Sequence, residues 1–390
     1  MIDLRPSRRG VLRGLGCSLA AFPLATPVAF AALPSEMRLV VVILRGAMDG
    51  LDVLQPYGDP LLAGLRSGLP LGPKAGAHDL TGFHALHPAL GDLLPLWRMG
   101  ELGFAQAVST PYRDRRSHFD GQDILEAGTA GDVPDLARRD GWLNRLLGTM
   151  PGAHGRTAFA VGREEMLILR GAADHAAWAP DARLDLAPAT ADLLSHVYHD
   201  DPLFRAAAET AMTLSGDGVD GGGRPRAQNA ALFDFAAAQL RQDARIAALS
   251  VGGWDSHRNQ PQQIARALGR LSEGMLTLRD RLGAVWDSTL VLAMTEFGRT
   301  VALNGTNGTD HGTGGTMVLA GGALDGGRVW GDWPGLDEAS LLDRRDLMPT
   351  RDVRAYAAWA LHGIFGTDRA TLSTLVFPGL DMGADPRLLG

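Results

Sequence analysis

The feature that most constrains the fold is an uninterrupted apolar run at residues 38–44, which ends in a polar turn containing two glycines. Such a run is typical of a parallel strand that is buried on both faces. Residues 102–108 have the same character. Two more apolar runs, at 245–251 and 288–294, flank a segment at 264–282 whose apolar residues recur at steps of three and four, as in an amphipathic helix. This strand–helix–strand order predicts a βαβ unit and therefore a largely parallel sheet.

Three shorter apolar stretches predict further strands, at 157–162, 166–170 and 316–320. A late helix is expected at 352–365, because Asp352 can cap its start and Gly366 can end it. With 390 residues, 45% of them apolar, the chain is long enough to bury a large core. We therefore expect an α/β fold with a largely parallel, doubly wound sheet flanked by helices, in a single domain at 32–390 with long loop insertions.

The N-terminal segment is typical of an export signal. Arg8 and Arg9 form a twin-arginine pattern, followed by a weakly apolar stretch at 11–30 and a small-x-small site at 29–31. Prolines and an arginine interrupt the apolar stretch, so it is a poor membrane span. We expect a twin-arginine signal peptide at 1–31, which is removed on export to the periplasm or the exterior. The chain's single cysteine lies in this segment, so the mature protein has no thiolate ligand and no cysteine nucleophile.

The charge of the chain argues against one class of partner. Acidic residues outnumber basic ones, 44 to 37, which gives a formal net charge of -7. An acidic chain is a poor general binder of nucleic acid, so no nucleic-acid partner is expected. Once the signal is removed, no stable membrane span is expected either.

Acidic residues and histidines follow several of the predicted strands. In open parallel sheets, ligands bind beyond the carboxyl ends of the strands. Carboxylates with imidazoles form the ligand set of zinc, or of manganese or calcium when carboxylates dominate. Each residue alone could instead cap a turn or a helix, as Asp49 could before Gly50. The candidate metal ligands are Asp49, Asp255, His257, Glu296, Asp310 and His311.

The segment after the second predicted strand carries further candidates. Ser117 precedes an expected helix and can act as its N-cap or as a nucleophile. His118 can ligate a metal, transfer protons or pack. Arg113 and Arg116, and Arg299 farther along the chain, can hold an anionic substrate or merely solvate loops.

These residues lie in motifs that resemble a known family. It is a family of unknown function of bacterial, twin-arginine-exported proteins, sulfatase-like, within the alkaline phosphatase superfamily. The motifs occur in the same order and span nearly the whole mature chain: LRGAMDGLD at 44–52, LHPAL at 86–90, SHFDGQD at 117–123, GWLN at 141–144, GWDSH at 253–257, TEFGRT at 295–300 and DHG at 310–312.

The resemblance implies roles for several residues. An Asp after the first strand binds metal in that superfamily, and Asp49 matches it. The nucleophile follows the next strand, where Ser117 is the best match and Thr110 the second. Asp255 and His257 resemble a ligand pair at shorter spacing than usual. In that superfamily an Asp-His pair normally ends a later strand. Here Glu296 stands at that strand end, and the pair, Asp310-His311, begins fourteen residues later. The Cys-x-Pro-x-Arg motif of formylglycine sulfatases is absent.

Together these observations predict an exported, metal-dependent hydrolase of a phosphate or sulfate ester, with a small-molecule or glycan substrate. Ser117, or water activated by the metal, would attack the ester. His118 would transfer protons, and Arg299 with Arg113 and Arg116 would hold the anion. Two alternatives stay open: a catalytically degenerate member of the fold that binds an envelope glycan or protein, and a closed metal site that only stabilises the fold.

Overall fold

A computed structural model describes residues 36–113, 115–131, 134–135, 139–179 and 225–390. The expected signal peptide at 1–31 lies outside these residues. None of the helices in the described ranges combines the length and the apolar character that crossing a bilayer requires.

The elements are named in chain order. The strands are β1 (Arg38–Arg45), β2 (Leu54–Gln55), β3 (His78–Asp79), β4 (Ala85–Leu86), β5 (Leu102–Ser109), β6 (Ala158–Val161), β7 (Ala176–Trp178), β8 (Ile246–Gly252), β9 (Thr289–Met294), β10 (Gly315–Ala320), β11 (Val329–Trp330) and β12 (Arg351–Asp352). The α-helices are α2 (Gly50–Val53), α3 (Leu62–Leu65), α4 (Leu94–Met99), α5 (His118–Ala127), α6 (Trp142–Leu147), α9 (Pro225–Leu240), α10 (Gln260–Leu282), α11 (Val353–Phe365) and α12 (Arg369–Thr371). Shorter helical turns are η1 (Pro73–Ala75), η2 (Pro88–Leu93), η3 (Leu167–Leu169), η4 (Gly283–Ser288) and η5 (Leu372–Val376).

The main sheet of the described residues is largely parallel, as the sequence predicts. Its strands lie in the order β11-β5-β10-β9-β1-β8-β6-β7, with β12 beside β5. β1 pairs in parallel with β8 and β9, and β6 pairs in parallel with β7 and β8. β10 runs antiparallel to both β5 and β9. The carboxyl ends of β1, β5, β8 and β9 therefore lie at one edge of the sheet, and the start of the reversed β10 lies at that same edge.

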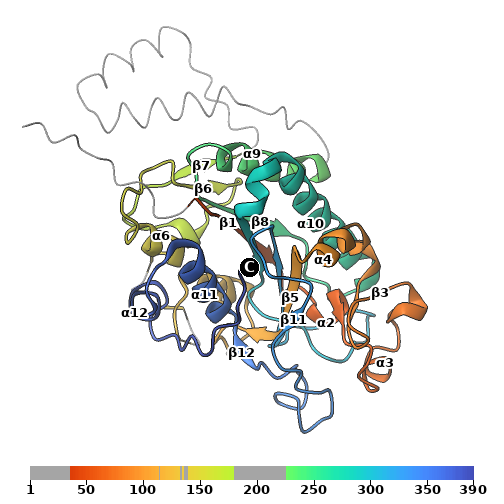
Figure 1. Cartoon of the computed structure of the whole chain (residues 1–390). Helices are drawn as coiled ribbons and strands as arrows, with labels where there is room; N and C mark the ends of the chain where they lie inside the picture. The colour runs from red at the N-terminus through yellow and green to blue at the C-terminus, as the bar shows by residue number, and fades with distance from the viewer. Residues whose placement is uncertain (1–35, 114, 132–133, 136–138, 180–224) are drawn as a thin grey trace, which may run out of the picture.

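Helices cover both faces of this sheet (Figure 1). Side chains alternate along a strand, so an all-apolar strand contributes to two cores. In β1, Val41 and Ile43 join a cluster that includes residues of α6 and α11. Val40 and Val42 join a second cluster that includes residues of α9 and α10. The continuous apolar run thus reflects burial on both sides, as expected for a doubly wound sheet.

One expectation about an individual element needs correction. Residues 166–170 are not a strand, because Leu167–Leu169 form the 3₁₀ turn η3 against α6. A short apolar run cannot distinguish a strand from another buried segment. The expected strand at 316–320 is present as β10, but it is antiparallel. The expected late helix is confirmed as α11, with Asp352 as its N-cap and Gly366 at its C-terminal end.

Candidate metal centre

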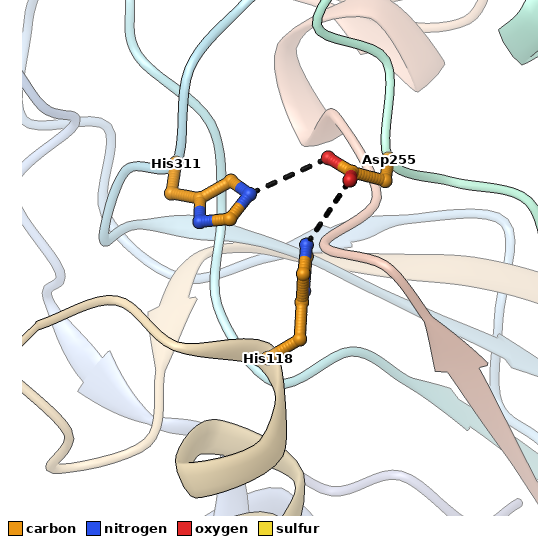
Figure 2. A group of neighbouring side chains, drawn as sticks. All are labelled: His118, Asp255 and His311. Carbon is orange, nitrogen blue, oxygen red and sulfur yellow. Dashed lines mark hydrogen bonds and ion pairs between the residues drawn. The ribbon is translucent and has the colours of Figure 1, made fainter.

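Loops at the carboxyl edge of the sheet bring four of the singled-out side chains together. Figure 2 shows three of them, His118, Asp255 and His311. One is the first residue of α5, two lie in the loop after β8, and one lies in the loop before β10. Because β10 is reversed, its preceding loop reaches the same edge as the loops that follow β1, β5 and β8. We call this set the His/Asp centre, and its members are His118, Asp255, His257 and His311.

His118 is fixed by the start of α5 and by a buried carboxylate. Ser117 caps the helix, and the His118 ring stacks on Phe297 with ring centroids 5.3 Å apart. His118 Nδ1 lies 2.8 Å from Oε1 of Glu296, whose side chain is fully buried. Oε1 of Glu296 also accepts the backbone N–H of Gly46 at 2.9 Å. These contacts aim the other ring nitrogen, His118 Nε2, toward Asp255.

The other two imidazoles are held through Nδ1 in the same way. His257 Nδ1 lies 3.0 Å from Oδ1 of Asp310, and Asn304 donates to that oxygen at 3.1 Å. His311 Nδ1 lies 2.6 Å from the backbone carbonyl of Arg116. Each of the three histidines thus has an acceptor at Nδ1. In the neutral imidazole, this arrangement places the proton on Nδ1 and leaves the Nε2 lone pair free.

The three Nε2 atoms converge on the carboxylate of Asp255. Its Oδ1 lies 3.1 Å from His257 Nε2 and 3.4 Å from His311 Nε2, while its Oδ2 lies 3.5 Å from His118 Nε2. The Nε2 atoms of His257 and His311 lie 2.9 Å apart. His118 Nε2 is buried and makes no well-formed hydrogen bond to a described residue. Ring nitrogens with a second-shell acceptor at Nδ1, gathered around one carboxylate, are the arrangement of a transition-metal site.

The carboxylates around His118 favour the charged form of its imidazole, so a metal bound at Nε2 would replace a proton there. Burial disfavours the charged form of the His118 imidazole, but the carboxylates of Asp255 and Glu296 outweigh it and raise the pKa to about 9. Burial likewise opposes ionisation of Asp255, yet contacts with His118, His311 and Arg299 hold the pKa of that carboxyl well below its usual range. The carboxylate is therefore charged at neutral pH and favours a cation beside it.

Glycine allows the loops to approach one another closely. Gly46, after β1, has a φ of +118°, and a Cβ there would lie 2.8 Å from the backbone nitrogen of Asp255. A Cβ on Gly308 would lie 2.3 Å from the backbone carbonyl carbon of His257. The loops that carry the centre therefore pack backbone to backbone, which requires glycine at these positions. Gly312, before β10, packs in the same way against the backbone of Arg299.

Not all the predicted metal ligands lie in the centre. Three of them lie there: Asp255, His257 and His311. The fourth member of the centre is His118, for which the sequence left metal ligation, proton transfer and packing as open roles. Glu296 and Asp310 instead contact Nδ1 of His118 and His257, so they orient these two rings. Asp49 is separate: its side chain is 1% exposed and pairs with Arg66.

The predicted anion-binding arginines are already engaged by protein groups. Arg299 is buried and donates to Asp255 at 2.5 Å and to the backbone carbonyls of Gly46 and Ala47. Arg113 donates to the carbonyls of the turn before it, and Arg116 pairs with Asp346. Their contacts brace the loops around the centre.

The two predicted nucleophiles, Ser117 and Thr110, differ in exposure and in the hydrogen bonds of their hydroxyls. Ser117 is partly exposed, and its hydroxyl accepts from the Asp120 backbone N–H at a long capping distance of 3.5 Å, its one hydrogen bond among the described residues. Thr110 is 1% exposed, and its hydroxyl donates to the Glu296 carbonyl.

Among the residues that sequence reasoning missed, Arg66 and Gln260 contact Asp49. Both residues lie outside the family motifs, and no regular spacing in the sequence links either of them to Asp49.

The fold and the centre define an α/β protein with a His/Asp cluster at the carboxyl edge of a mostly parallel sheet. Residues 104–355 match the family described as "Protein of unknown function (DUF1501)". This match covers more than half of the chain, so the chain belongs to that family, and the expectation of a family of unknown function is confirmed. Among curated proteins, none has a matching sequence.

Several solved structures are similar at low identity. The lipoteichoic acid synthase LtaP from Listeria monocytogenes is 10% identical with a TM-score of 0.32, and the similarity covers 70% of this chain and 59% of that protein. The C-terminal periplasmic domain of EcEptC from Escherichia coli, in complex with Zn, is 10% identical with a TM-score of 0.41, covering 90% of this chain and 92% of that domain. A protein in the alkaline phosphatase superfamily from Vibrio parahaemolyticus is 12% identical with a TM-score of 0.35, covering 85% and 68%. The chain thus spans about three fifths of the synthase's length.

Proposed function

We propose that this protein is an exported, metal-dependent hydrolase of phosphate or sulfate esters. The observation that carries the proposal is the convergence of three imidazole Nε2 atoms on the Asp255 carboxylate. Nitrogen and oxygen donors in this number favour zinc, with manganese or calcium as alternatives. The ligand set that we propose is the His/Asp centre, His118 included.

The exposure of the centre supports catalysis over a purely structural role. The side chains of Asp255 and His257 are 45% and 42% exposed. Four protein ligands close a tetrahedral structural zinc site, so catalysis with the proposed ligand set requires a fifth coordination position, of the kind that some catalytic zinc sites take in the transition state. The exposed side of Asp255 and His257 leaves room for a substrate or water at such a position. A substrate can therefore reach these donors without a rearrangement of the core.

Charge near the centre supports an anionic substrate. A cavity of about 260 Å³ adjoins Asp310 and Asn304 and is also lined by Arg344 and Arg345. Arg345 donates to the backbone carbonyl of His311, so its charge lies beside the centre. Such cationic groups favour the approach of a phosphate or sulfate ester.

The proposed reaction divides its tasks among the chain's own groups. The Ser117 oxygen attacks the phosphorus or sulfur of the ester, the bond to the alcohol oxygen breaks, and the alcohol leaves with a proton, the serine proton having been lost. Water then hydrolyses the covalent seryl ester, which releases phosphate or sulfate and restores the serine; direct attack by water, with the same loss of the alcohol, is the alternative. A divalent ion at the centre would supply Lewis acidity that promotes ionisation of the nucleophile and balances the charge of the transition state. Glu296 and Asp310 keep His118 and His257 oriented. The looseness of the Ser117 cap supports its assignment as nucleophile.

A binding protein without turnover is the second candidate. It is favoured by the pairing of Asp49 with Arg66, since such pairing removes a strand-end carboxylate from catalysis. In both cases we propose export through the twin-arginine signal at 1–31. The substrate of the enzyme would be a glycan ester or a small-molecule ester. The partner of the binding protein would be an envelope glycan or an envelope protein.

The first experiment measures metal and activity on the same samples. Wild type and His311→Ala, with exposed His154→Ala as the matched control, are loaded with zinc, freed of excess metal and examined by elemental analysis. We expect bound zinc in wild type and His154→Ala and its loss in His311→Ala. Hydrolysis of p-nitrophenyl phosphate or p-nitrophenyl sulfate should follow the same order.

Three outcomes separate the candidates. Metal with ester hydrolysis supports the enzyme. Metal in folded protein, without hydrolysis of any ester in a broad phosphate and sulfate panel, favours the binding protein. No bound zinc, manganese or calcium after loading of the wild type contradicts the metal centre.

A further inference from the structure

Asp49 lies in a closed network of buried polar side chains, which we call the Asp49 network: Asp49, Asp52, Arg66 and Gln260. The Asp49 and Arg66 side chains are 1% and 0% exposed, and Arg66 Nη1 lies 2.6 Å from Asp49 Oδ2. Gln260 donates to that same oxygen at 2.6 Å, and the backbone N–H of Leu51 donates to Oδ1 at 3.1 Å. Both carboxylate oxygens therefore already accept hydrogen bonds from protein donors.

Arg66 is fixed independently of Asp49. Its Nε donates to the carbonyl of Val301 at 2.9 Å and its Nη2 to the carbonyl of Thr300 at 2.9 Å. These carbonyls belong to the segment that leads to Asn304 and Asp310. A guanidinium has a rigid planar fork and stays charged in proteins, so Arg66 is a permanent cation held in one orientation.

Arg299 pairs with Asp255 as Arg66 pairs with Asp49, but Arg299 leaves one carboxylate oxygen of Asp255 facing a histidine. It donates to Asp255 Oδ1 at 2.5 Å and to backbone carbonyls around the turn after β1. The second oxygen, Asp255 Oδ2, faces His118 Nε2. Asp255 can therefore pair with an arginine and still offer an oxygen to a metal. No histidine in the described part of the chain makes a hydrogen bond or ion pair with Asp49, although the charges of Asp52 and Asp49 act on His87. The neighbours of Asp49 donate N–H groups that compete with a cation for the same lone pairs.

We propose that the centre holds a single metal ion and that the guanidinium of Arg66 takes the place of a second cation at Asp49. This inference rests on the proposed metal centre and specifies its stoichiometry. A buried carboxylate needs a compensating charge, and a fixed guanidinium supplies it without any bound ion. The position that the family resemblance associates with a metal ligand is then structural in this chain.

The Asp49 network also connects to the loops of the centre. Gln260 Nε2 donates to both Asp49 and Asp52, while its Oε1 accepts from Ser256 and Thr309. Those two residues directly precede His257 and Asp310. Loss of the network should therefore lower stability without removing a ligand.

The test counts metal ions per chain in full-length protein loaded separately with zinc, manganese and calcium. Variants are Asp49→Asn, the double variant Asp49→Asn/Arg66→Met, which removes both charges together, and His311→Ala as the control for ligand loss. Circular dichroism identifies the variants that fold. We expect one equivalent in wild type and in each folded Asp49 variant, a lower melting temperature for Asp49→Asn, and loss of metal in His311→Ala. If Asp49→Asn does not fold, the double variant decides the question.

The outcomes distinguish this inference from the proposed function. Two equivalents in wild type, one of them lost in a folded Asp49 variant, overturn the single-ion inference and leave the hydrolase proposal intact. Loss of a single equivalent in a folded Asp49 variant also overturns it, because Asp49 would then be a ligand. No metal in wild type under any loading contradicts the metal centre itself.

Discussion

Two regions of the molecule use the same residue type at the same edge of the sheet and differ in what surrounds it. Asp255 follows β8, is 45% exposed and pairs with Arg299 through Oδ1, and imidazole nitrogens, which carry lone pairs in the neutral form, surround it. Asp49 follows β1, is 1% exposed and is surrounded by N–H donors from Arg66 and Gln260. Lone-pair donors around a carboxylate create a place for a cation, whereas N–H donors fill that place. A carboxylate at a strand end is therefore available to a cation when one of its oxygens stays free of N–H donors, as we propose for Asp255 Oδ2 beside the Arg299-paired Oδ1.

The largest expected effect tests whether the open region carries the chemistry. Ser117→Ala should lower ester turnover by at least about a thousandfold, because the nucleophile is lost, while the bound metal is unchanged. Loss of the cap itself costs about 1 kcal/mol, so rates are compared per folded, metal-loaded chain. Ser373→Ala, an exposed hydroxyl on η5, is the control. A variant that retains the wild-type rate would assign the attack to Thr110 or to water and remove Ser117 from the mechanism.

A second prediction sharpens the distinction between ligands and the residues that orient them. Glu296→Gln keeps the shape of the side chain but removes the charge that faces His118 Nδ1. Metal affinity should fall about 10–100-fold, as is typical for a second-shell partner, without loss of the site. Competition with a chelator of known affinity measures this change. Complete loss of binding in folded Glu296→Gln would mean that Glu296 is itself a ligand.

The smallest effect concerns the closed region and appears as pH dependence. Burial and the neighbouring charge of Asp49 raise the pKa of Asp52. A carboxyl with a folded pKa above its unfolded value of about 3.9 binds more protons when folded, so its stabilising contribution falls as the pH rises from about 4 through the folded pKa. Asp52→Asn lacks this contribution. Its free energy of unfolding should therefore decline less than that of wild type over this range.

Urea denaturation at several pH values measures this difference. The slopes of the two proteins should differ by at most about 1.4 kcal/mol per pH unit, the value for one proton. Asp243→Asn, at an exposed carboxyl, should follow the wild-type slope. Identical slopes for wild type and Asp52→Asn would show that Asp52 does not titrate differently on folding.

Much of the fold was predictable because its signals are local. The apolar runs became β1, β5, β8 and β9, and the three-and-four spacing became α10. These patterns record burial on one or both faces, which is a property of consecutive residues. The prediction of a strand at 166–170 was wrong because five residues are too few to show whether the apolar positions repeat as in a strand or as in a helix. The direction of β10 could not be predicted, since strand direction depends on which strands become neighbours.

The candidate site was predictable in part for a related reason. Sequence reasoning placed His257 and His311 in a metal set because strand ends meet at one edge. It could not separate ligands from their supports, because Glu296 and Asp310 have the same donor atoms as Asp255. The assignment depends on distances of a few ångströms between residues far apart in the chain. The twin-arginine signal and the single domain at 32–390 stay predictions.

The sequence by itself determined the α/β class, the main strands and the set of acidic and imidazole side chains that lie near one edge. Only the tertiary structure decided that three imidazoles share one carboxylate while Arg66 neutralises another. The physical reason is that burial and periodicity are properties of neighbouring residues in the chain. Charge compensation is instead a property of neighbours in space, and Arg66 reaches Asp49 through no motif that the sequence displays.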